Sequence, residues 1–349
     1  MIFLGNDKKC NEVLMKNLRK LGKYGPEIMP VGIGAMSFTN VYGKCDTDQA
    51  FKILKYAMEN GVNHVDTANI YGAGVSEERI GKFIANTGKT AKEFFRIATK
   101  ASIWTDPKTK ARAFNNNGRY LEDELTKSLK RLGVECVDLF YVHRRDPNIE
   151  IEEVTDSLAK LVKKGMTRLI GYSEIAPSSL RRANAVHHVA AVQSEYSLST
   201  RSVEMGLVQT CDELGTSLVA YSPLGRSLLT DNPIKIEKAK SLDFFESNPR
   251  FNSPNYEENI DLTNKLREYS KGKNIPTASL VIAWLLAKGD HIIPIPGTRS
   301  ITHFKEIIEG TKILFNKGLI NDIEKILPIG WAHGERYSSS QWIGPEKYC

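Results

Sequence analysis

Residues 137–143 read VDLFYVH, a short apolar run of residues that favour strands. A helical pattern follows from Ile151 to Lys164, and Gly165 stands one step past its end, where glycine suits the left-handed cap. The next apolar run ends near Tyr172. A strand, a helix and a further strand in succession are the building unit of a parallel sheet.

The same unit recurs along the chain, and we count eight copies of it. The eight apolar runs end near Gly34, Asp66, Lys100, His143, Tyr172, Glu195, Tyr221 and Pro296. Helical patterns lie between them, for example at 47–60, 120–132, 151–164 and 203–214. Eight such units predict an α/β fold, the (β/α)₈ TIM barrel, whose active site lies at the C-terminal ends of the strands.

Length and composition agree with one globular barrel. At about 150 residues per domain, 349 residues allow one or two domains, but barrels exceed that size as single units and no linker divides this chain. A hydrophobic content of 41% with 26% charged residues excludes disordered, fibrous and membrane proteins. We predict one domain at 19–340, an N-terminal extension at 1–18 and a C-terminal tail at 341–349. The longest irregular stretch, about 228–254, follows the seventh strand.

Charge and cysteine content narrow the class of partner and the compartment. The net charge of +7 is spread along the chain, which favours an anionic ligand such as a phosphorylated cofactor over nucleic acid. Five widely spaced cysteines without a C-x-x-C pair indicate neither a disulfide framework nor a metal site. No apolar run is long enough for a signal peptide or a membrane span, so we expect no membrane partner and a cytoplasmic location.

Four polar residues stand at the ends of the predicted strands and converge on one face if the barrel is right. Asp66, Lys100 and His143 close three of the strands, and Tyr71 follows Asp66 by five residues. This set can donate a proton to a carbonyl oxygen from the Tyr71 phenol. An adjacent Lys100 ammonium is expected to lower the pKa of that phenol, and Asp66 would keep Lys100 protonated. His143 could bind the carbonyl oxygen or share the proton.

Each of these residues alone also has an ordinary structural role, such as packing or capping a helix, so the argument rests on their convergence.

Two weaker patterns also occur in the sequence. The segment Gly32-Ile33-Gly34 has two glycines of a dinucleotide-binding fingerprint, but Ser37 stands at the position of the third glycine, so the pattern does not predict a Rossmann fold. Five aromatic residues in loops after strands could line a substrate pocket or pack in the core: Phe38, Trp104, Phe244, Phe245 and Tyr256.

From about Arg19 to Ser340 the sequence resembles the aldo-keto reductase family. The matching segments are 21–36, 66–72 with Ser76 and Glu77, the strand ending at Lys100, 141–143, 170–174, 193–198, 220–226 and 295–299. Segments 249–251, 283–286 and 334–337 resemble the branch of pyridoxal reductases and related NADPH-dependent carbonyl reductases. The resemblance implies a nicotinamide-dependent barrel reductase whose catalytic tetrad matches Asp66, Tyr71, Lys100 and His143.

The resemblance also implies residues that hold the cofactor, NADPH. Ser173 and Gln193 match residues at the nicotinamide carboxamide, and Tyr221 matches the aromatic residue that stacks on the ring. The remaining matches are Ser222, Leu224 and Arg226 at the pyrophosphate, Gly297, Thr298 and Arg299 at the adenosine 2′-phosphate, and Glu306 in the segment near the adenine. The chain departs from the family pattern at Glu174, Ser300 and 305–307, where many relatives have other residues.

The function expected is reduction of the carbonyl of a small aldehyde or ketone to an alcohol, with Tyr71 as proton donor and no metal. Two alternatives stay open at this stage. One is a cofactor-binding regulator that resembles potassium-channel β-subunits, since a fold does not fix a function. The other is a barrel aldolase or lyase in which Lys100 forms a Schiff base. The physiological substrate and the oligomeric state are not encoded in these motifs.

Overall fold

The computed structural model describes residues 18–106, 108, 111–314 and 316–349. The N-terminal extension predicted at 1–18 therefore lies outside the described residues except for Leu18. The order of the main sheet is β12-β11-β10-β9-β8-β5-β4-β3, and every pairing in it is parallel. Its strands are β3 (Ile33–Gly34), β4 (His64–Asp66), β5 (Arg96–Ala101), β8 (Val137–Val142), β9 (Thr167–Ser173), β10 (Val189–Glu195), β11 (Ser217–Tyr221) and β12 (Ile292–Pro294).

The sheet closes on itself. The backbone N–H of Gly32 donates to the carbonyl of Pro294 at 2.9 Å, and that of Gly34 donates to the carbonyl of Pro296 at 3.1 Å. These bonds join the chain at β3 to the chain at β12, which are the first and last strands of the sheet. The predicted (β/α)₈ barrel is therefore confirmed.

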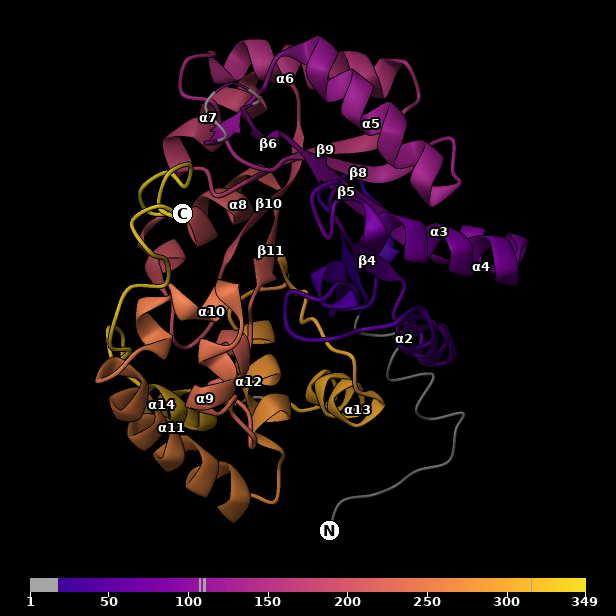
Figure 1. Cartoon of the computed structure of the whole chain (residues 1–349). Helices are drawn as coiled ribbons and strands as arrows, with labels where there is room; N and C mark the ends of the chain where they lie inside the picture. Colours follow the sequence, from indigo (N-terminus) through magenta and orange to yellow (C-terminus); the bar gives the residue numbers. More distant parts are fainter. Residues whose placement is uncertain (1–17, 107, 109–110, 315) are drawn as a thin grey trace.

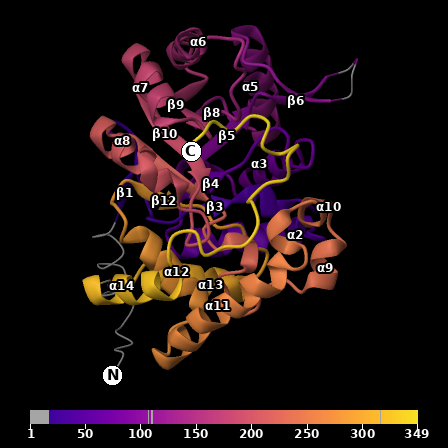
Figure 2. The same cartoon turned by 90° about the vertical axis from the view of Figure 1, so that its left-hand side faces the viewer.

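Helices surround the barrel strands, as Figures 1 and 2 show. They are α2 (Thr47–Glu59), α3 (Val75–Thr87), α4 (Lys89–Phe94), α5 (Gly118–Leu132), α6 (Ile151–Lys163), α7 (Pro177–Val186), α8 (Leu207–Leu214), α11 (Asn255–Gly272), α12 (Thr277–Leu286), α13 (Ile301–Gly310) and α14 (Lys317–Ile326). The sequence of α6 explains its position. Its apolar residues Ile151, Val154 and Leu158 recur at helical spacing and are all buried, so one stripe of the helix faces the sheet.

Two apolar clusters hold the barrel together. The larger fills the space between the strands and the helices around them. The smaller lies inside the barrel and includes Tyr141, Val219 and Ile293. Leu21 and Ile28 belong to it too, and they are part of a hairpin of β1 (Arg19–Lys20) and β2 (Glu27–Ile28), in which Leu21 directly follows β1 and Ile28 ends β2. The hairpin therefore packs against the barrel interior, as expected of a packed core rather than a pore.

The helix expected at 203–214 is divided in the structure. A 3₁₀ helix, η2 (Ser202–Met205), comes first, and α8 begins only at Leu207. Gly206 between them has φ of 145°, a conformation that interrupts a helix and that residues with a Cβ rarely adopt. The sequence pattern did not separate these two elements because their apolar residues stay in register.

Further elements lie in the segments after the strands. An antiparallel hairpin of β6 (Ile103–Thr105) and β7 (Arg112–Phe114) follows β5 and was not expected from the sequence. The stretch expected to be irregular at 228–254 contains three short helices, α9 (Ile236–Lys240), α10 (Asp243–Glu246) and η4 (Pro249–Phe251). They share a small apolar cluster that includes Leu228 and Phe251.

The C-terminal segment returns to the barrel. Figure 2 shows it in yellow, crossing over the strands. Glu346 ties it down, because its carboxylate accepts from Arg145 at 2.9 Å and from the backbone N–H of Ala176 at 2.7 Å. Across the described part of the chain, none of the helices is long and apolar enough to span a membrane.

Candidate active site

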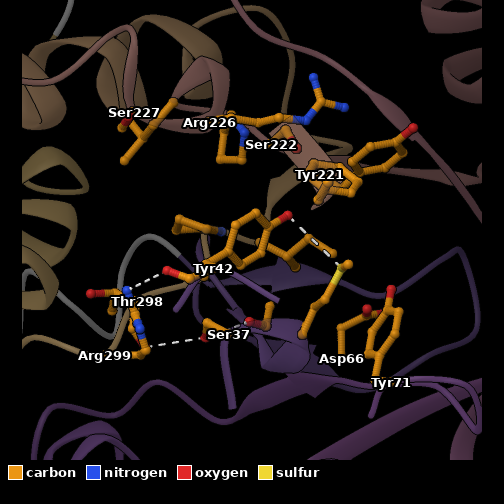
Figure 3. Close-up of a pocket in the computed structure, with 18 of the residues that line it drawn as sticks. Ser37, Tyr42, Asp66, Tyr71, Tyr221, Ser222, Arg226, Ser227, Thr298 and Arg299 are labelled. Atoms are coloured by element: carbon orange, nitrogen blue, oxygen red, sulfur yellow. Dashed lines mark hydrogen bonds between the residues drawn. The ribbon is translucent and has the colours of Figure 1, made fainter. Parts of the chain in front are cut away.

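A cavity of about 780 Å³ opens at the ends of the barrel strands. Asp66, Tyr71 and His143 line it, together with all ten residues expected to hold a cofactor. Figure 3 shows Asp66 and Tyr71 on one side of the cavity and Thr298 and Arg299 on the opposite side. The closed barrel explains this gathering, since residues far apart in sequence follow neighbouring parallel strands.

Lys100 lies behind the cavity wall rather than in it. Its side chain is fully buried, and its ammonium forms an ion pair with the Asp66 carboxylate and donates to the Thr67 carbonyl at 2.8 Å. The second oxygen of Asp66 accepts from Gln193 Nε2 at 2.8 Å. One buried carboxylate therefore fixes both the lysine and the glutamine, and all three side chains come from barrel strands.

Tyr71 stands between this ion pair and the cavity. Lys100 Nζ is 3.5 Å from Tyr71 Oη, a long hydrogen bond, and lies 5.1 Å from the centroid of the phenol ring. The ring of His143 meets the ring of Tyr71 edge to face, with 5.8 Å between centroids. Tyr71 is half-buried, so its hydroxyl is within reach of a ligand in the cavity.

The sequence led us to expect a lowered pKa for Tyr71, but in the structure its net pKa is raised. Burial raises the pKa of Tyr71 above its ordinary value and the Asp66 carboxylate raises it further, while Arg144 lowers it. Burial is the largest of these causes, because it disfavours the charged phenolate. The phenol is therefore protonated at neutral pH and carries the proton that a reduction requires.

His143 is neutral in this environment. Burial lowers the pKa of its imidazole well below the ordinary value, and the positive charges of Arg144 and Lys100 lower it further. Its Nδ1 is buried and has no hydrogen-bond partner. A neutral imidazole can donate a hydrogen bond to a carbonyl oxygen, but it holds no spare proton to transfer.

The residues expected at the nicotinamide end of a cofactor lie near this group. Ser173 ends β9, and its Oγ accepts from Arg144 Nη1 at 2.9 Å. Tyr221 ends β11 and is half-buried, with its hydroxyl donating to Glu174 at 2.6 Å and contacting the hydroxyl of Tyr337. Ser173 and Tyr221 thus end β9 and β11, and Gln193 lies two residues before the end of β10, the strand between them.

Glu174 belongs to a buried network that sequence patterns did not reveal. Arg336 donates to both of its carboxylate oxygens, at 2.9 and 2.5 Å, and Cys349 Sγ lies 3.0 Å from one of them. Arg336 and Tyr221 hold the pKa of Glu174 well below its ordinary value despite burial. In the sequence, the only indication of this network was that Glu174 departs from the family pattern. Its partner Arg336 is 162 residues away along the chain, so no local spacing connects the two.

Arg226 also has a buried partner. Its guanidinium donates to both oxygens of Glu195, at 3.1 and 2.6 Å. Ser222, Leu224 and Arg226 all line the cavity, and Ser222 and Arg226 have φ values of 49° and 53°. This irregular turn after β11 brings its backbone to the cavity wall, although the Arg226 charge itself is paired.

Gly297, Thr298 and Arg299 line the far end of the cavity, and Glu306 from α13 is half-buried beside them. The Arg299 guanidinium donates to the backbone carbonyls of Tyr42 at 2.8 Å and Lys44 at 2.9 Å. Arg299 therefore tethers the segment after η1 (Ala35–Phe38) while three of its five donor hydrogens stay available.

The five aromatic residues that could line a substrate pocket fall into two groups in the structure. Phe244 and Phe245 of α10 line the cavity, whereas Phe38, Trp104 and Tyr256 do not. Phe38 packs in the larger core and Tyr256 in the cluster of the short helices.

Among the residues that the structure describes, no three His, Cys, Asp or Glu side chains gather in a way that could hold a metal ion.

Comparison with known proteins matches residues 30–328 to the model of the aldo/keto reductase family. The chain belongs to the aldo/keto reductase family. Two curated members are each 35% identical to it. One, from Schizosaccharomyces pombe, is named aldo-keto reductase yakc with NADP(+) in its name, and the alignment covers 90% of this chain and 93% of that protein. The other is probable aldo-keto reductase 1 of Glycine max, with 91% of each chain covered.

Solved structures of aldo/keto reductases share the fold. A glycerol dehydrogenase from Gluconobacter oxydans superposes with a TM-score of 0.77 at 22% identity, covering 89% of this chain and 95% of that one. At this identity the likeness establishes the barrel and nothing about the substrate. Membership of the family makes this chain an oxidoreductase of the aldo/keto reductase type.

Proposed function

We propose that this protein is an NADPH-dependent reductase that converts the carbonyl group of a small aldehyde or ketone into an alcohol, with Tyr71 as proton donor. One observation carries the proposal. A protonated phenol faces the cavity, with the Lys100–Asp66 pair behind it and the neutral imidazole of His143 beside it.

The cavity fits a nicotinamide dinucleotide in size and in chemistry. Its volume lies within the range of about 300–1,000 Å³ typical of ligand sites. Hydroxyl groups of Ser227 and Thr298 line the side that also carries Arg299, which suits phosphate groups. Ser222 lines the cavity beside Tyr221. The other side offers Tyr221, Ser173 and Gln193, an aromatic ring with polar neighbours that suits a nicotinamide. When bound, NADPH supplies the hydride that reduces the carbonyl carbon.

The residues of this chain then bind the carbonyl oxygen and protonate it. Tyr71 Oη and the imidazole of His143 both donate hydrogen bonds to that oxygen. As the carbon is reduced, the oxygen gains negative charge and becomes a stronger base than phenolate, so the proton moves from Tyr71 to the oxygen. Lys100 then lies 3.5 Å from the phenolate and stabilises its charge.

The alternative of a Schiff-base aldolase is disfavoured by the surroundings of Lys100. Its ammonium is fully buried and has two close acceptors, Asp66 and Thr67. A nucleophilic lysine must be deprotonated and must face the substrate. Lys100 does not face the substrate, since it lies in a barrel strand behind Tyr71 and is absent from the cavity lining. Burial lowers the pKa of Lys100, but its ion pair with Asp66 opposes that shift and favours the ammonium form.

We also propose a cytoplasmic location. The four cysteines in the described part of the chain are all free, as expected in a reducing compartment. This proposal rests on cysteine chemistry alone, and it can be checked by fractionating cells that produce the full-length chain.

Steady-state turnover tests the proposed function directly. Loss of NADPH is measured with pyridoxal, aromatic aldehydes and short aliphatic aldehydes as substrates, and the alcohol product is identified. We expect turnover on the order of 10 per second with a good substrate, the usual value for enzymes. Tight binding of NADPH with turnover below about one per minute on every carbonyl compound would favour the regulatory alternative instead.

A further inference from the structure

Two arginines at the Tyr71 end of the cavity have no acidic partner. Arg112 lies on β7 and Arg144 directly follows His143, and both line the cavity. Within the described ranges, no ion pair joins either guanidinium to a carboxylate. By contrast, Arg226 and Arg336, which lie close by, are each paired with a buried glutamate at 2.6 and 2.5 Å.

Arg144 is 6% exposed, so its charge is largely removed from water. Its Nη1 donates to the His143 carbonyl at 2.6 Å and to Ser173 Oγ at 2.9 Å, while its buried Nε has no partner. Glu174 is the acidic residue with the largest electrostatic effect on Arg144, but Arg336 already occupies both of its oxygens. Burial alone lowers the pKa of Arg144, but Tyr337, Tyr221 and Glu174 raise it above the ordinary value, so the guanidinium is charged. Its direct hydrogen-bond partners are neutral, which leaves room for an anion.

Arg112 adds a second positive charge at the rim. It is exposed on the β6–β7 hairpin, opposite Thr105, and its guanidinium lies 5.5 Å from the centroid of the Phe114 ring. The pKa of Arg112 is lowered by partial burial and then by repulsion from Arg144, so the two charges act on the same region. Tyr337 and Tyr221 act against this repulsion, but the net pKa of Arg112 stays lowered.

The phosphates of a dinucleotide do not account for this charge. The hydroxyl groups and Arg299 that suit phosphates lie on the other side of the cavity from Tyr71. Arg112 and Arg144 instead share their end with Tyr71 and His143, and the apolar side chains of Ile70 and Ile103 line it as well. A ligand there meets an apolar wall, two hydrogen-bond donors for a carbonyl oxygen, and two cations.

We propose that Arg112 and Arg144 form a subsite for a carboxylate group on the substrate, so that the preferred substrates are aldehydes or ketones with an apolar body and an acidic group. The carboxylate accepts charge-assisted hydrogen bonds from the two guanidinium groups while the carbonyl oxygen faces Tyr71. This inference rests on the proposed function, because it assigns the substrate class of the same site.

A matched pair of aldehydes tests the subsite. 4-Carboxybenzaldehyde and its neutral methyl ester have similar shape and the same reactive group, and kcat/KM is measured for each with NADPH. We expect the acid to be preferred at least about tenfold, since hydrogen bonds to charged groups contribute about 1.5–3 kcal/mol. Arg112→Gln should reduce that preference about tenfold. Arg119→Gln removes an exposed arginine outside the cavity lining and should leave the preference unchanged.

Binding of a non-reducible probe separates the subsite from the reaction. Calorimetry with the NADP⁺-loaded protein compares 4-methylbenzoate with the neutral 4-methylbenzamide. We expect the benzoate to bind more tightly, and Arg112→Gln to weaken its binding about tenfold with a smaller effect on the amide. This result without turnover of any aldehyde would keep the subsite and reject the proposed reductase function.

Two results would overturn the subsite. One is equal kcat/KM for the acid and the ester in the wild-type enzyme. The other is an Arg112→Gln variant that weakens both members of each pair equally, which would give Arg112 a structural role. Because Arg112 is exposed on a hairpin, its substitution leaves the barrel core intact and the comparison stays interpretable.

Discussion

Asp66 organises the candidate site at the scale of single residues. Its two carboxylate oxygens accept from Lys100 and Gln193, which come from different barrel strands, and Lys100 in turn lies behind Tyr71. Removing this carboxylate would leave a buried ammonium without its partner, a change that typically costs about 3–5 kcal/mol. The position of the phenol thus depends on a residue that does not itself need to touch the substrate.

Arg299 is expected to distinguish NADPH from NADH. A guanidinium matches a phosphate group geometrically, and Arg299 lines the cavity with donor hydrogens to spare. Arg299→Ala should weaken NADPH binding by about 1.5–3 kcal/mol, the range for hydrogen bonds to charged groups. NADH binding should change little, as measured by quenching of protein fluorescence.

The same substitution releases the carbonyls of Tyr42 and Lys44, so NADH serves as the control for loosening of that segment. Equal weakening of both cofactors would mean that Arg299 acts only by tethering the segment. It would then have no role in recognising a 2′-phosphate.

Sequence patterns predicted where the site residues lie, but not which partners their side chains have. Asp66, Tyr71, Lys100 and His143 were predicted to converge because each stands at or just after the end of a strand, and parallel strands fix where their ends meet. The partners of Glu174 and Arg226 were not predicted, because Arg336 and Glu195 follow from three-dimensional packing rather than from spacing. The pKa of Tyr71 was misjudged because it depends first on how deeply the phenol is buried, which spacing along the chain does not show.

At the scale of elements, close packing of α3 on α5 depends on Gly81. A Cβ added there would lie 2.1 Å from the backbone carbonyl oxygen of Arg131, which cannot move aside without shifting α5. Gly81→Ala should therefore lower the free energy of unfolding by about 1–3 kcal/mol, the usual cost of overpacking. Urea denaturation monitored by circular dichroism measures the change.

Gly272, the last residue of α11, is the matched control. A Cβ there meets nothing within 4 Å, so Gly272→Ala should be neutral or slightly stabilising. A Gly81→Ala variant as stable as Gly272→Ala would contradict the close α3–α5 contact.

Helices and strands were predicted best where the hydrophobic pattern of the segment is clear. The ends of the eight barrel strands follow from apolar runs, and α6 follows from helical spacing. The break at Gly206 and the β6–β7 hairpin were missed, because a single left-handed residue or a short pair of strands leaves little periodicity. The hairpin carries Arg112, so an element that was not predicted from the sequence holds part of the proposed subsite for a substrate carboxylate.

At the scale of the whole molecule, buried histidines make stability depend on pH. Burial lowers the pKa of His64 and of His143 below the ordinary value, which is about 6.5 in an unfolded chain. Between the folded and unfolded pKa values the unfolded chain binds more protons. Their contribution to stability is therefore fully present above about pH 6.5 and is lost as the pH falls below it.

We expect the free energy of unfolding to decrease between pH 7 and pH 5.5, by up to about 1.4 kcal/mol per pH unit for each fully buried imidazole. Urea titrations at several pH values give the slope. His143→Asn should reduce that slope, whatever its effect on stability at pH 7. A slope identical to that of the wild type would mean that His143 is not held neutral by its surroundings.

The central claim is that the Tyr71 hydroxyl protonates the carbonyl oxygen, and Tyr71→Phe tests it most directly. The phenylalanine ring keeps the packing against His143. The measurement is the single-turnover rate of carbonyl reduction with saturating NADPH, together with the NADPH dissociation constant. We predict that the rate falls by about 10²–10⁴, the usual span for general acid catalysis, while NADPH binding is unchanged. A variant that keeps more than about a tenth of the wild-type rate would contradict the claim.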